Sequence, residues 1–265
     1  MVVNRVGGHV GQDDPIGQAQ RIGAEAAQFF LGDPQGWKAP SFPHPGGASA
    51  LVEQAREADI AIYIHAPYVI NVATSNNRIR IPSRKLLTQQ IAAATAIGAS
   101  GLIVHGGHVT KEDDPQVGYD NWRKAVDQIE FTCPVFIENT AGGQHAMARH
   151  LDDVSRLWDA VGHSGVGFCL DTCHAWAGGI DLPTGVELFR AITGRIDLVH
   201  ANDSAGEFDS GRDRHRNLGE GTIGLDRVLE SCAAAKSAVI CETASPGIID
   251  DIAVIREFLS NGSTA

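Results

Sequence analysis

Eight short apolar runs recur along the chain, and amphipathic or alanine-rich segments separate them. Most of the runs are rich in valine and isoleucine and apolar at consecutive positions, which is typical of parallel strands buried on both faces. The predicted strands lie near 2–10, 26–32, 60–66, 101–106, 134–139, 166–172, 196–202 and 238–243. The predicted helices include 49–59, 83–99, 119–130, 152–162, 225–236 and 251–260.

Strands that alternate with helices predict an α/β fold with a parallel sheet. Eight strand–helix units in 265 residues average about 33 residues each, which fits a (β/α)8 TIM barrel. A chain of this length with 43% hydrophobic residues can bury one full-sized core, so we expect a single domain over residues 1–265. A doubly wound open sheet would bring together only the strand ends beside its switch point.

Metal-binding residue types stand at or just after the ends of six predicted strands. They are His65, His105, Glu138, Asp171, His200 and Glu242. In a TIM barrel the carboxyl ends of all strands meet at one face, so we expect these side chains to converge. No lysine or arginine stands among them, and burial and repulsion both penalise a carboxylate cluster without a counter-charge. A bound divalent metal would remove that penalty.

Three further residues with ligand chemistry follow close behind strand ends. They are His174 and the pair Asp213 and His215 in the run GRDRHRN. Any one of these residues alone would more often be a capping or hydrogen-bonded residue than a ligand. Their number and their common placement favour a metal centre.

Net charge and cysteine content bear on the partners and the cellular compartment of the protein. With 21 lysines and arginines against 32 acidic residues, the formal net charge is −11, the wrong sign for nucleic-acid binding through a general basic surface. Any such contact must be local. No apolar run reaches the roughly 18 residues of a membrane span, and the N-terminus lacks a signal-peptide pattern, so we expect a cytoplasmic protein that does not bind membranes. The cysteines number five, which is odd, and four of them lie in or beside apolar runs where a reduced thiol packs as a small hydrophobic residue, so we expect no disulfides.

Several ordered motifs resemble those of one enzyme family. The motifs are HAPYVIN (65–71), VHGGH (104–108), IENTAGG (137–143), LDTCHAWAGGID (170–181), HANDS (200–204), GRDRHRNLGEGTIG (211–224) and CETA (241–244). Together they resemble endonuclease IV, the zinc-dependent apurinic/apyrimidinic endonucleases (AP endonuclease family 2). GGHV (7–10) and FFLGDPQGW (29–37) extend the resemblance to the first two strands, so it covers nearly the whole chain.

The resemblance implies a TIM barrel that holds three zinc ions. The first zinc would take His65, His105 and Glu138. The second would share Glu138 and add Asp171, His200 and Glu242, and the third would take His174, Asp213 and His215. Mixed histidine and carboxylate ligands suit zinc, and Mn²⁺ also suits the second position, which is richer in oxygen.

The same resemblance implies the reaction and the substrate. The expected activity is DNA repair: hydrolysis of the phosphodiester 5′ to an abasic site in double-stranded DNA, which leaves a 3′-hydroxyl, together with removal of 3′-blocking groups. Metal-activated water would be the nucleophile, and Glu138 and Glu242 would be the catalytic residues that orient it. We expect the protein to act as a monomer.

DNA contacts are also implied, since the family bends the duplex and flips the abasic nucleotide into a pocket. Tyr68 and Trp37 are the expected probes of the lesion. Gln35 stands where many family members have an arginine that enters the minor groove, and Val69 stands where a longer apolar wedge is often found. The loop 76–80, with Arg78 and Arg80, is the best basic stretch for phosphates, and its alternative interpretation is a solvated loop and helix start.

Two other classes of protein remain as alternatives. Sugar isomerases and epimerases of related barrel architecture also place Glu, Asp and His at strand ends, but they generally use one or two metals and would not need His174, Asp213 and His215. A non-catalytic DNA-lesion binder would keep the basic and aromatic loops and could lose ligands. The chain contains no G-x-x-x-x-G-K-[ST] and no G-x-S-x-G motif, so phosphate-loop NTPase and serine hydrolase chemistry lack support.

Overall fold

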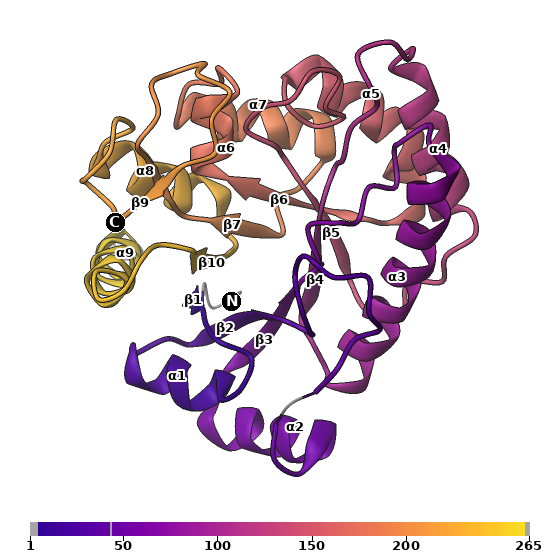
Figure 1. Cartoon of the computed structure of the whole chain (residues 1–265). Coiled ribbons are helices and arrows are strands. Elements are labelled where there is room, and N and C mark those ends of the chain that lie inside the picture. Colours follow the sequence, from indigo (N-terminus) through magenta and orange to yellow (C-terminus); the bar gives the residue numbers. More distant parts are fainter. Residues whose placement is uncertain (1–4, 43, 263–265) are drawn as a thin grey trace.

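A closed barrel of eight parallel strands forms the centre of the protein, as the computed structural model shows (Figure 1). The structure describes residues 5–42 and 44–262, so the predicted start of the first strand at 2–4 lies outside the described residues. The barrel strands are β1 Val6–His9, β2 Ala26–Phe30, β3 Ala61–His65, β4 Gly101–His105, β5 Val135–Glu138, β6 Gly167–Asp171, β7 Leu198–His200 and β10 Ala238–Cys241. All eight predicted strands are present, and the predicted (β/α)8 fold is confirmed.

Helices surround the barrel and connect its strands (Figure 1). Their bounds are α1 Pro15–Arg21, α2 Gly47–Ala58, α3 Asn77–Ala96, α4 Gln116–Val126, α5 Leu151–Val161, α6 Thr172–Ala177, α7 Thr184–Thr193, α8 Leu225–Ala235 and α9 Ile248–Gly262. A 3-10 turn covers Gly162–Ser164. The six predicted helices are present. The segment expected to be a basic loop at 76–80 is instead the first turn of α3, because the Asn76 side chain caps the helix by accepting from Arg78 N.

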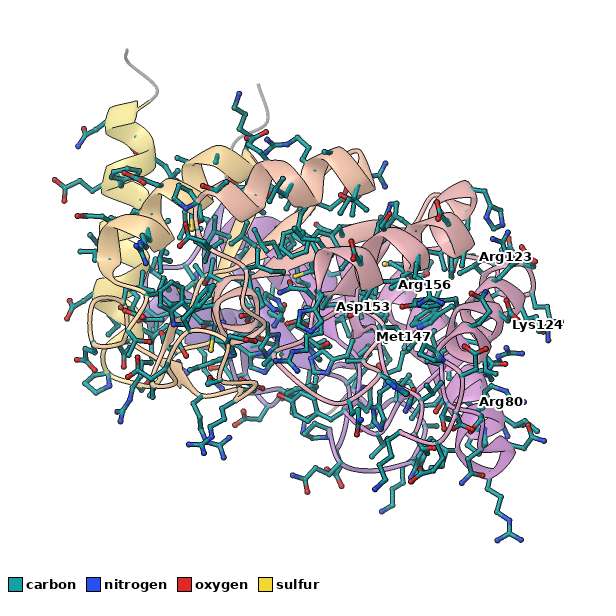
Figure 2. All side chains as sticks on the ribbon, turned by 90° about the horizontal axis from the view of Figure 1, so that it is seen from above. Arg80, Arg123, Lys124, Met147, Asp153 and Arg156 are labelled. Carbon is teal, nitrogen blue, oxygen red and sulfur yellow. The ribbon has the colours of Figure 1, made fainter. Side chains whose placement is uncertain are left out.

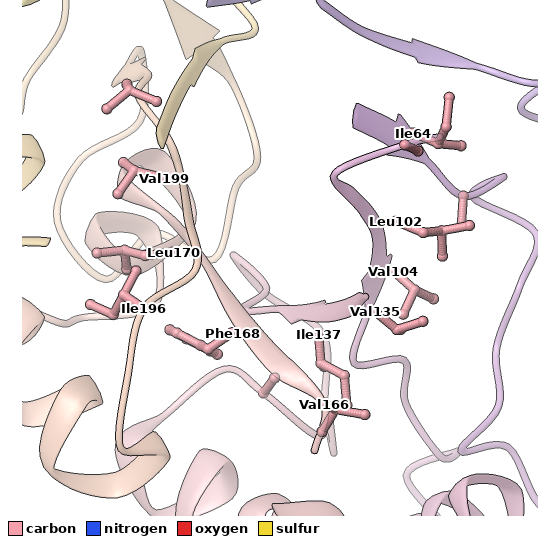
Figure 3. Close-up of a cluster of buried hydrophobic side chains, with 14 of the residues drawn as sticks. Ile64, Leu102, Val104, Val135, Ile137, Val166, Phe168, Leu170, Ile196 and Val199 are labelled. Carbon is pink, nitrogen blue, oxygen red and sulfur yellow. The ribbon is translucent and has the colours of Figure 1, made fainter. Parts of the chain in front are cut away.

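Side chains that alternate along each strand pack outward against the helices. Figure 3 shows several of them, with Leu102 and Val104 on β4 and Phe168 and Leu170 on β6. These residues belong to the large buried cluster that also contains the inner faces of the helices. This alternation with a period of two is the expected geometry of a strand with both faces covered.

The intervening side chains point into the barrel and form a second, smaller apolar cluster. It consists of Ala26, Tyr63, Ile103, Phe136, Cys169, Leu198 and Ile240, one from each of seven strands. A Cβ atom at Gly101 or Gly167 would lie 2.3 Å or 2.6 Å from the Phe136 ring, so the neighbouring strands leave that space to the aromatic side chain. The lower barrel is therefore a packed core.

A short antiparallel hairpin lies beyond β7. Its strands are β8 Asp203–Ser204 and β9 His215–Arg216, paired Asp203 to Arg216 and Ser204 to His215. The buried Asp203 carboxylate accepts from the backbone N–H groups of Gly219, Gly221 and Ile223, which anchors the following turn. The hairpin thereby presents its loop over the carboxyl ends of the barrel strands.

Two further expectations concern the chain as a whole. All five cysteines are free and buried, as predicted. Among the described residues, no helix combines the length and the apolar character needed to span a bilayer.

Candidate metal centre

A ring of polar side chains lies one layer above the apolar interior of the barrel. Each member stands two residues after an inward-facing position on its strand, so it points into the barrel as well. The members are His9, Gln28, His65, His105, Glu138, Asp171, His200 and Glu242. Six of the eight are the residues predicted at strand ends, and the structure brings all six to the same face of the barrel.

The first group of candidate ligands is His65, His105 and Glu138. Glu138 Oε2 lies 3.3 Å from His65 Nε2 and 3.2 Å from His105 Nε2. His65 Nδ1 donates to the carbonyl of Ala66 at 2.7 Å, so its proton is on Nδ1 and the Nε2 lone pair faces the group. This arrangement places two imidazole nitrogens and one carboxylate oxygen where they can converge on a cation.

The second group shares Glu138 and adds Asp171, His200 and Glu242. Glu138 Oε1 lies 3.2 Å from His200 Nδ1, and Glu242 Oε2 lies 3.5 Å from the same nitrogen. Glu138 thus directs one oxygen to each group. A carboxylate in this position can bridge two cations.

The third group, His174, Asp213 and His215, comes from segments outside the barrel strands. His174 is on α6, and the Asp171 side chain accepts from His174 N at 2.7 Å, so a ligand of the second group also caps the helix that carries His174. Asp213 Oδ2 lies 3.2 Å from His174 Nε2, and Asp213 Oδ1 lies 3.1 Å from His215 Nε2. The hairpin therefore completes a site begun by the barrel.

The donor chemistry of the three groups fits divalent cations. Five imidazoles and four carboxylates meet there, and within residues 5–42 and 44–262 no lysine or arginine forms an ion pair with those carboxylates. His215 Nε2 is buried without a hydrogen-bond partner among the described residues, while carboxylate oxygens of Asp213 and Asp171 lie at 3.1 Å and 3.5 Å. A cation between these atoms would satisfy them.

Burial and mutual charge shift the proton equilibria of these groups. Burial, helped by the negative charge of Glu138, raises the pKa of the Asp171 carboxyl in spite of the nearby imidazoles. Burial also opposes charge on Glu138, but the imidazoles of His105 and His200 outweigh it and hold the pKa of Glu138 well below its usual range. Burial opposes charge on His215 in the same way, yet the Asp171 and Asp213 carboxylates raise its pKa to about 9. Without metal, protons therefore take over part of the charge balance in this centre.

Sequence reasoning missed three amides that hold the ligands in place. Asn139 Oδ1 accepts from Asp171 N at 2.7 Å, and Asn202 Nδ2 donates to Asp171 Oδ2 at 2.8 Å. Gln28 contacts both His200 and Glu242. The only available signal was placement: Asn139 and Asn202 follow ligand positions by one and two residues, and Gln28 is a lone amide in the apolar run AAQFF.

Two hollows flank the centre. One of about 350 Å³ is lined by residues that include Tyr68, His105, His174 and Asp213. The other, of about 910 Å³, is lined by residues that include His9, Phe30, Pro34 and Thr243. The first is lined by candidate ligands, and the second meets the centre at His9, whose Nδ1 lies 3.5 Å from Glu242 Oε1, so a substrate could lie across the centre with parts on either side.

The expected lesion probes lie at the mouth of the barrel. Tyr68 is 54% exposed and Trp37 is 47% exposed, and Tyr68 packs its ring 5.2 Å from Phe30. Tyr68 N donates to the carbonyl of Pro34 at 2.8 Å, which joins the loop of Gln35 and Trp37 to that of Tyr68. Gln35 is exposed, whereas Val69 is half-buried and packs against the core.

The two predicted basic residues of α3 differ in whether their side chains are engaged in hydrogen bonds. Arg78 is exposed. Arg80 donates to the carbonyls of Thr74 and Ser75 at 2.8 Å and 2.9 Å, and Figure 2 shows it near the outer margin of the molecule. Arg80 therefore stabilises the turn before α3 in this structure.

A second basic element, which the sequence analysis did not single out, lies on the hairpin. Arg212, Arg214 and Arg216 are exposed and alternate with Asp213 and His215, which face the third group. We call these three residues the arginine ridge. No carboxylate of the described residues forms an ion pair with them, so the ridge offers positive charge beside the centre.

Comparisons with known proteins agree with this geometry. A family model described as a xylose isomerase-like TIM barrel matches residues 16–258. A probable endonuclease 4 from Mycobacterium marinum is 54% identical over 256 residues, which are 97% of this chain and 99% of the relative. The crystal structure of endonuclease IV from Thermus thermophilus has a TM-score of 0.81 at 23% identity and covers 97% of this chain and 99% of its own.

A D-tagatose 3-epimerase-like protein is also similar in structure. Its TM-score is 0.78 at 19% identity, with 98% of this chain and 100% of the other covered. At such identities a structural similarity shows the fold alone. The family follows from the sequence match of 54% over nearly the full length of both chains, together with the family model. This chain belongs to the endonuclease IV family.

Proposed function

We propose that this protein is a DNA repair endonuclease that hydrolyses the phosphodiester 5′ to an abasic site and leaves a 3′-hydroxyl. The observation that carries the proposal is the set of three ligand groups, of which the first two share Glu138, beside a hollow lined by His105, His174 and Asp213. The relative from M. marinum is named a probable endonuclease 4, which supports DNA as the substrate. Removal of 3′-blocking groups would use the same centre.

The proposed resident metals are three zinc ions, held by the three groups described above, with Mn²⁺ also suited to the second group because it has three carboxylates. When bound, such ions supply Lewis-acid stabilisation of the negative charge that builds on a phosphate during hydrolysis. Glu138 and Glu242 have ionised carboxylates that only accept hydrogen bonds, so they can orient an attacking water between them. Burial opposes charge on Glu242 as well, but His200, His9 and His215 lower its pKa and keep it ionised.

Among residues 5–42 and 44–262, no thiol near the centre is activated as an alternative nucleophile. Cys173 and Cys241 stand directly before the ligands His174 and Glu242, and Cys169 stands two residues before Asp171. Burial raises the pKa of Cys169 and Cys173 to about 12 and that of Cys241 well above its usual value. A thiol is nucleophilic as the thiolate, so all three remain inert at neutral pH. Direct attack by water fits these residues better than a covalent intermediate.

Recognition of DNA would rest on the local surface around the mouth of the barrel. Tyr68 and Trp37 supply exposed aromatic faces, and the arginine ridge supplies cations in a chain whose net charge is −11. Lysine and arginine contacts to phosphates release counterions, so each contact changes the salt dependence of binding by about 0.9 in the logarithmic slope. We expect the triple variant Arg212→Ala, Arg214→Ala and Arg216→Ala to flatten that slope by about 0.9 for each of the one to three phosphate contacts that it removes. An unchanged slope would exclude the ridge from the DNA contact surface.

All nine candidate ligands come from one chain, which supports a monomer that acts as a single domain over residues 1–265. Because the proposed substrate is DNA, we propose a cytoplasmic location. Light scattering of the purified protein measures its molar mass, and a mass well above the 28.1 kDa of one chain would contradict a monomer.

The central experiment combines metal analysis with cleavage of a duplex that contains one tetrahydrofuran abasic analogue. We expect about three zinc ions per chain, incision 5′ to the analogue, and a 3′ end that a polymerase can extend. The second candidate, a metal-dependent sugar epimerase, is favoured by structural similarity to proteins such as the D-tagatose 3-epimerase-like protein, which shows the fold alone. One or two metals per chain, no incision and turnover of a ketose would support that candidate and contradict ours.

A further inference from the structure

Gln28 belongs to the polar ring at the strand ends but to none of the three ligand groups. Its side chain is fully buried and points inward from β2, between His9 on β1 and the ligand-bearing strands. An amide buried among imidazoles and carboxylates can both donate and accept, which neither of those groups does when ionised. Its contacts therefore determine how its neighbours are protonated and oriented.

The contacts of Gln28 fix the orientation of its amide. Its Nε2 donates to Glu242 Oε1 at 2.6 Å, and its Oε1 lies 2.8 Å from His200 Nε2. Because the ionised Glu242 carboxylate can only accept, the amide NH2 must face Glu242 and the amide oxygen must face His200. His200 therefore carries a proton on Nε2, and its Nδ1, which lies 3.2 Å from Glu138 Oε1, is the nitrogen that faces the second group.

We propose that Gln28 is a positioning residue for the second metal group, where its single amide orients two of the four ligands, His200 and Glu242. The inference rests on the proposed function in so far as that group holds zinc. A histidine ligand commonly donates its other N–H to an oxygen that fixes its tautomer and ring orientation. Here the same oxygen-bearing side chain also fixes a carboxylate, so the two ligands are coupled through one residue.

Other histidines of the centre obtain this support from the backbone. His65 Nδ1 lies 2.7 Å from the carbonyl of Ala66, and His174 Nδ1 lies 2.9 Å from the carbonyl of Asn139. A backbone carbonyl cannot be removed by substitution. His200 depends on a side chain, so the second group is the one whose positioning can be tested by mutation.

The test is zinc affinity of Gln28→Met, measured by competition with a chromogenic chelator. Methionine has a similar length and can neither donate to Glu242 nor accept strongly from His200. The matched control is Gln90→Met, since Gln90 is equally buried on α3 and its recorded hydrogen bond, to the carbonyl of Leu31, is long at 3.4 Å. We expect one of the bound zinc ions to be held 10- to 100-fold more weakly in Gln28→Met and no zinc to weaken in Gln90→Met. Equal zinc affinity in Gln28→Met and wild type would overturn the proposal.

Two further measurements separate positioning from a general structural role. In steady-state cleavage, Gln28→Met should lower kcat while KM stays within about twofold, because the DNA-facing loops are unchanged. In zinc-loaded wild type, ¹⁵N shifts of the imidazoles should place the His200 proton on Nε2; a proton on Nδ1 refutes the proposal even if the variant fails to fold. Absence of zinc or of abasic-site cleavage in wild type would instead contradict the proposed function.

Discussion

Replacing Glu138 with glutamine tests the centre at the residue that joins two of its groups. Its Oε2 lies 3.3 Å from His65 Nε2 and 3.2 Å from His105 Nε2, and its Oε1 lies 3.2 Å from His200 Nδ1. Glutamine keeps the shape but removes the negative charge, and its NH2 group would donate to a nitrogen lone pair that a metal needs. The substitution therefore weakens the first and second groups at once.

The magnitude follows from this double role. Loss of one preorganised electrostatic contact typically costs a factor of about 10² to 10³ in kcat. Because Glu138 serves two groups, we expect a loss of at least about 1000-fold, or about 4 kcal/mol of transition-state stabilisation. The apolar layer below, with Phe136 on the same strand, is untouched, so the cost to folding should stay within about 1–3 kcal/mol.

The assay is single-turnover and steady-state cleavage of the tetrahydrofuran duplex, with circular dichroism and metal analysis of the same samples. Glu130→Gln is the matched control, since Glu130 is a carboxylate ahead of the same strand and outside the three ligand groups. Near-normal turnover by a well-folded, metal-loaded Glu138→Gln protein would refute the assignment of Glu138 as a shared ligand.

Three other predictions concern metal retention, DNA binding and pH. Prolonged treatment with a strong zinc chelator should abolish cleavage while brief exposure leaves it intact, because the groups are largely buried; immediate loss in EDTA that Mg²⁺ alone restores would argue against zinc. Gln35→Arg should lower KM on abasic duplex and steepen its salt dependence by about 0.9 in the logarithmic slope, with kcat unchanged, and an unaltered slope would remove the loop 33–37 from the DNA interface. The pKa values of His174 and His215 are raised, the latter to about 9, so in the metal-free protein their contribution to stability is complete below about pH 6.5 and is lost as pH rises toward 9. A melting temperature of the chelated protein that stays level over that window would contradict this coupling.

The barrel and its strand ends could be predicted because both depend on local patterns. Buried parallel strands give continuous apolar runs, and a ligand type at the end of such a run is visible without knowing its neighbours. His65, Glu138 and Asp171 are the last residues of their strands, so their convergence follows from the closure of the barrel alone. Their roles as metal ligands stay a prediction.

The parts that escaped prediction depend on contacts between distant segments. In the sequence, Gln28 looks like any other amide in an apolar run. Its hydrogen bonds to His200 and Glu242 depend on the registers of β2 with β1 and of β1 with β10. The alternation in the arginine ridge requires the hairpin strands β8 and β9, which have two residues each and no apolar pattern. Helix α1 has seven residues, too few to give a reliable period of 3.6.

The centre is assembled from two separable parts of the fold. Every ligand of the first and second groups belongs to the ring at the strand ends, whereas His174 lies on α6 and Asp213 and His215 lie on the hairpin segment. A barrel of this type could therefore acquire or lose the third group through changes in the β6 and β7 connections alone, without disturbing the strands. Transplanting those two connections onto a barrel with a two-group ring would be a direct route to engineering a third metal site, and variation among relatives should concentrate in the same two places.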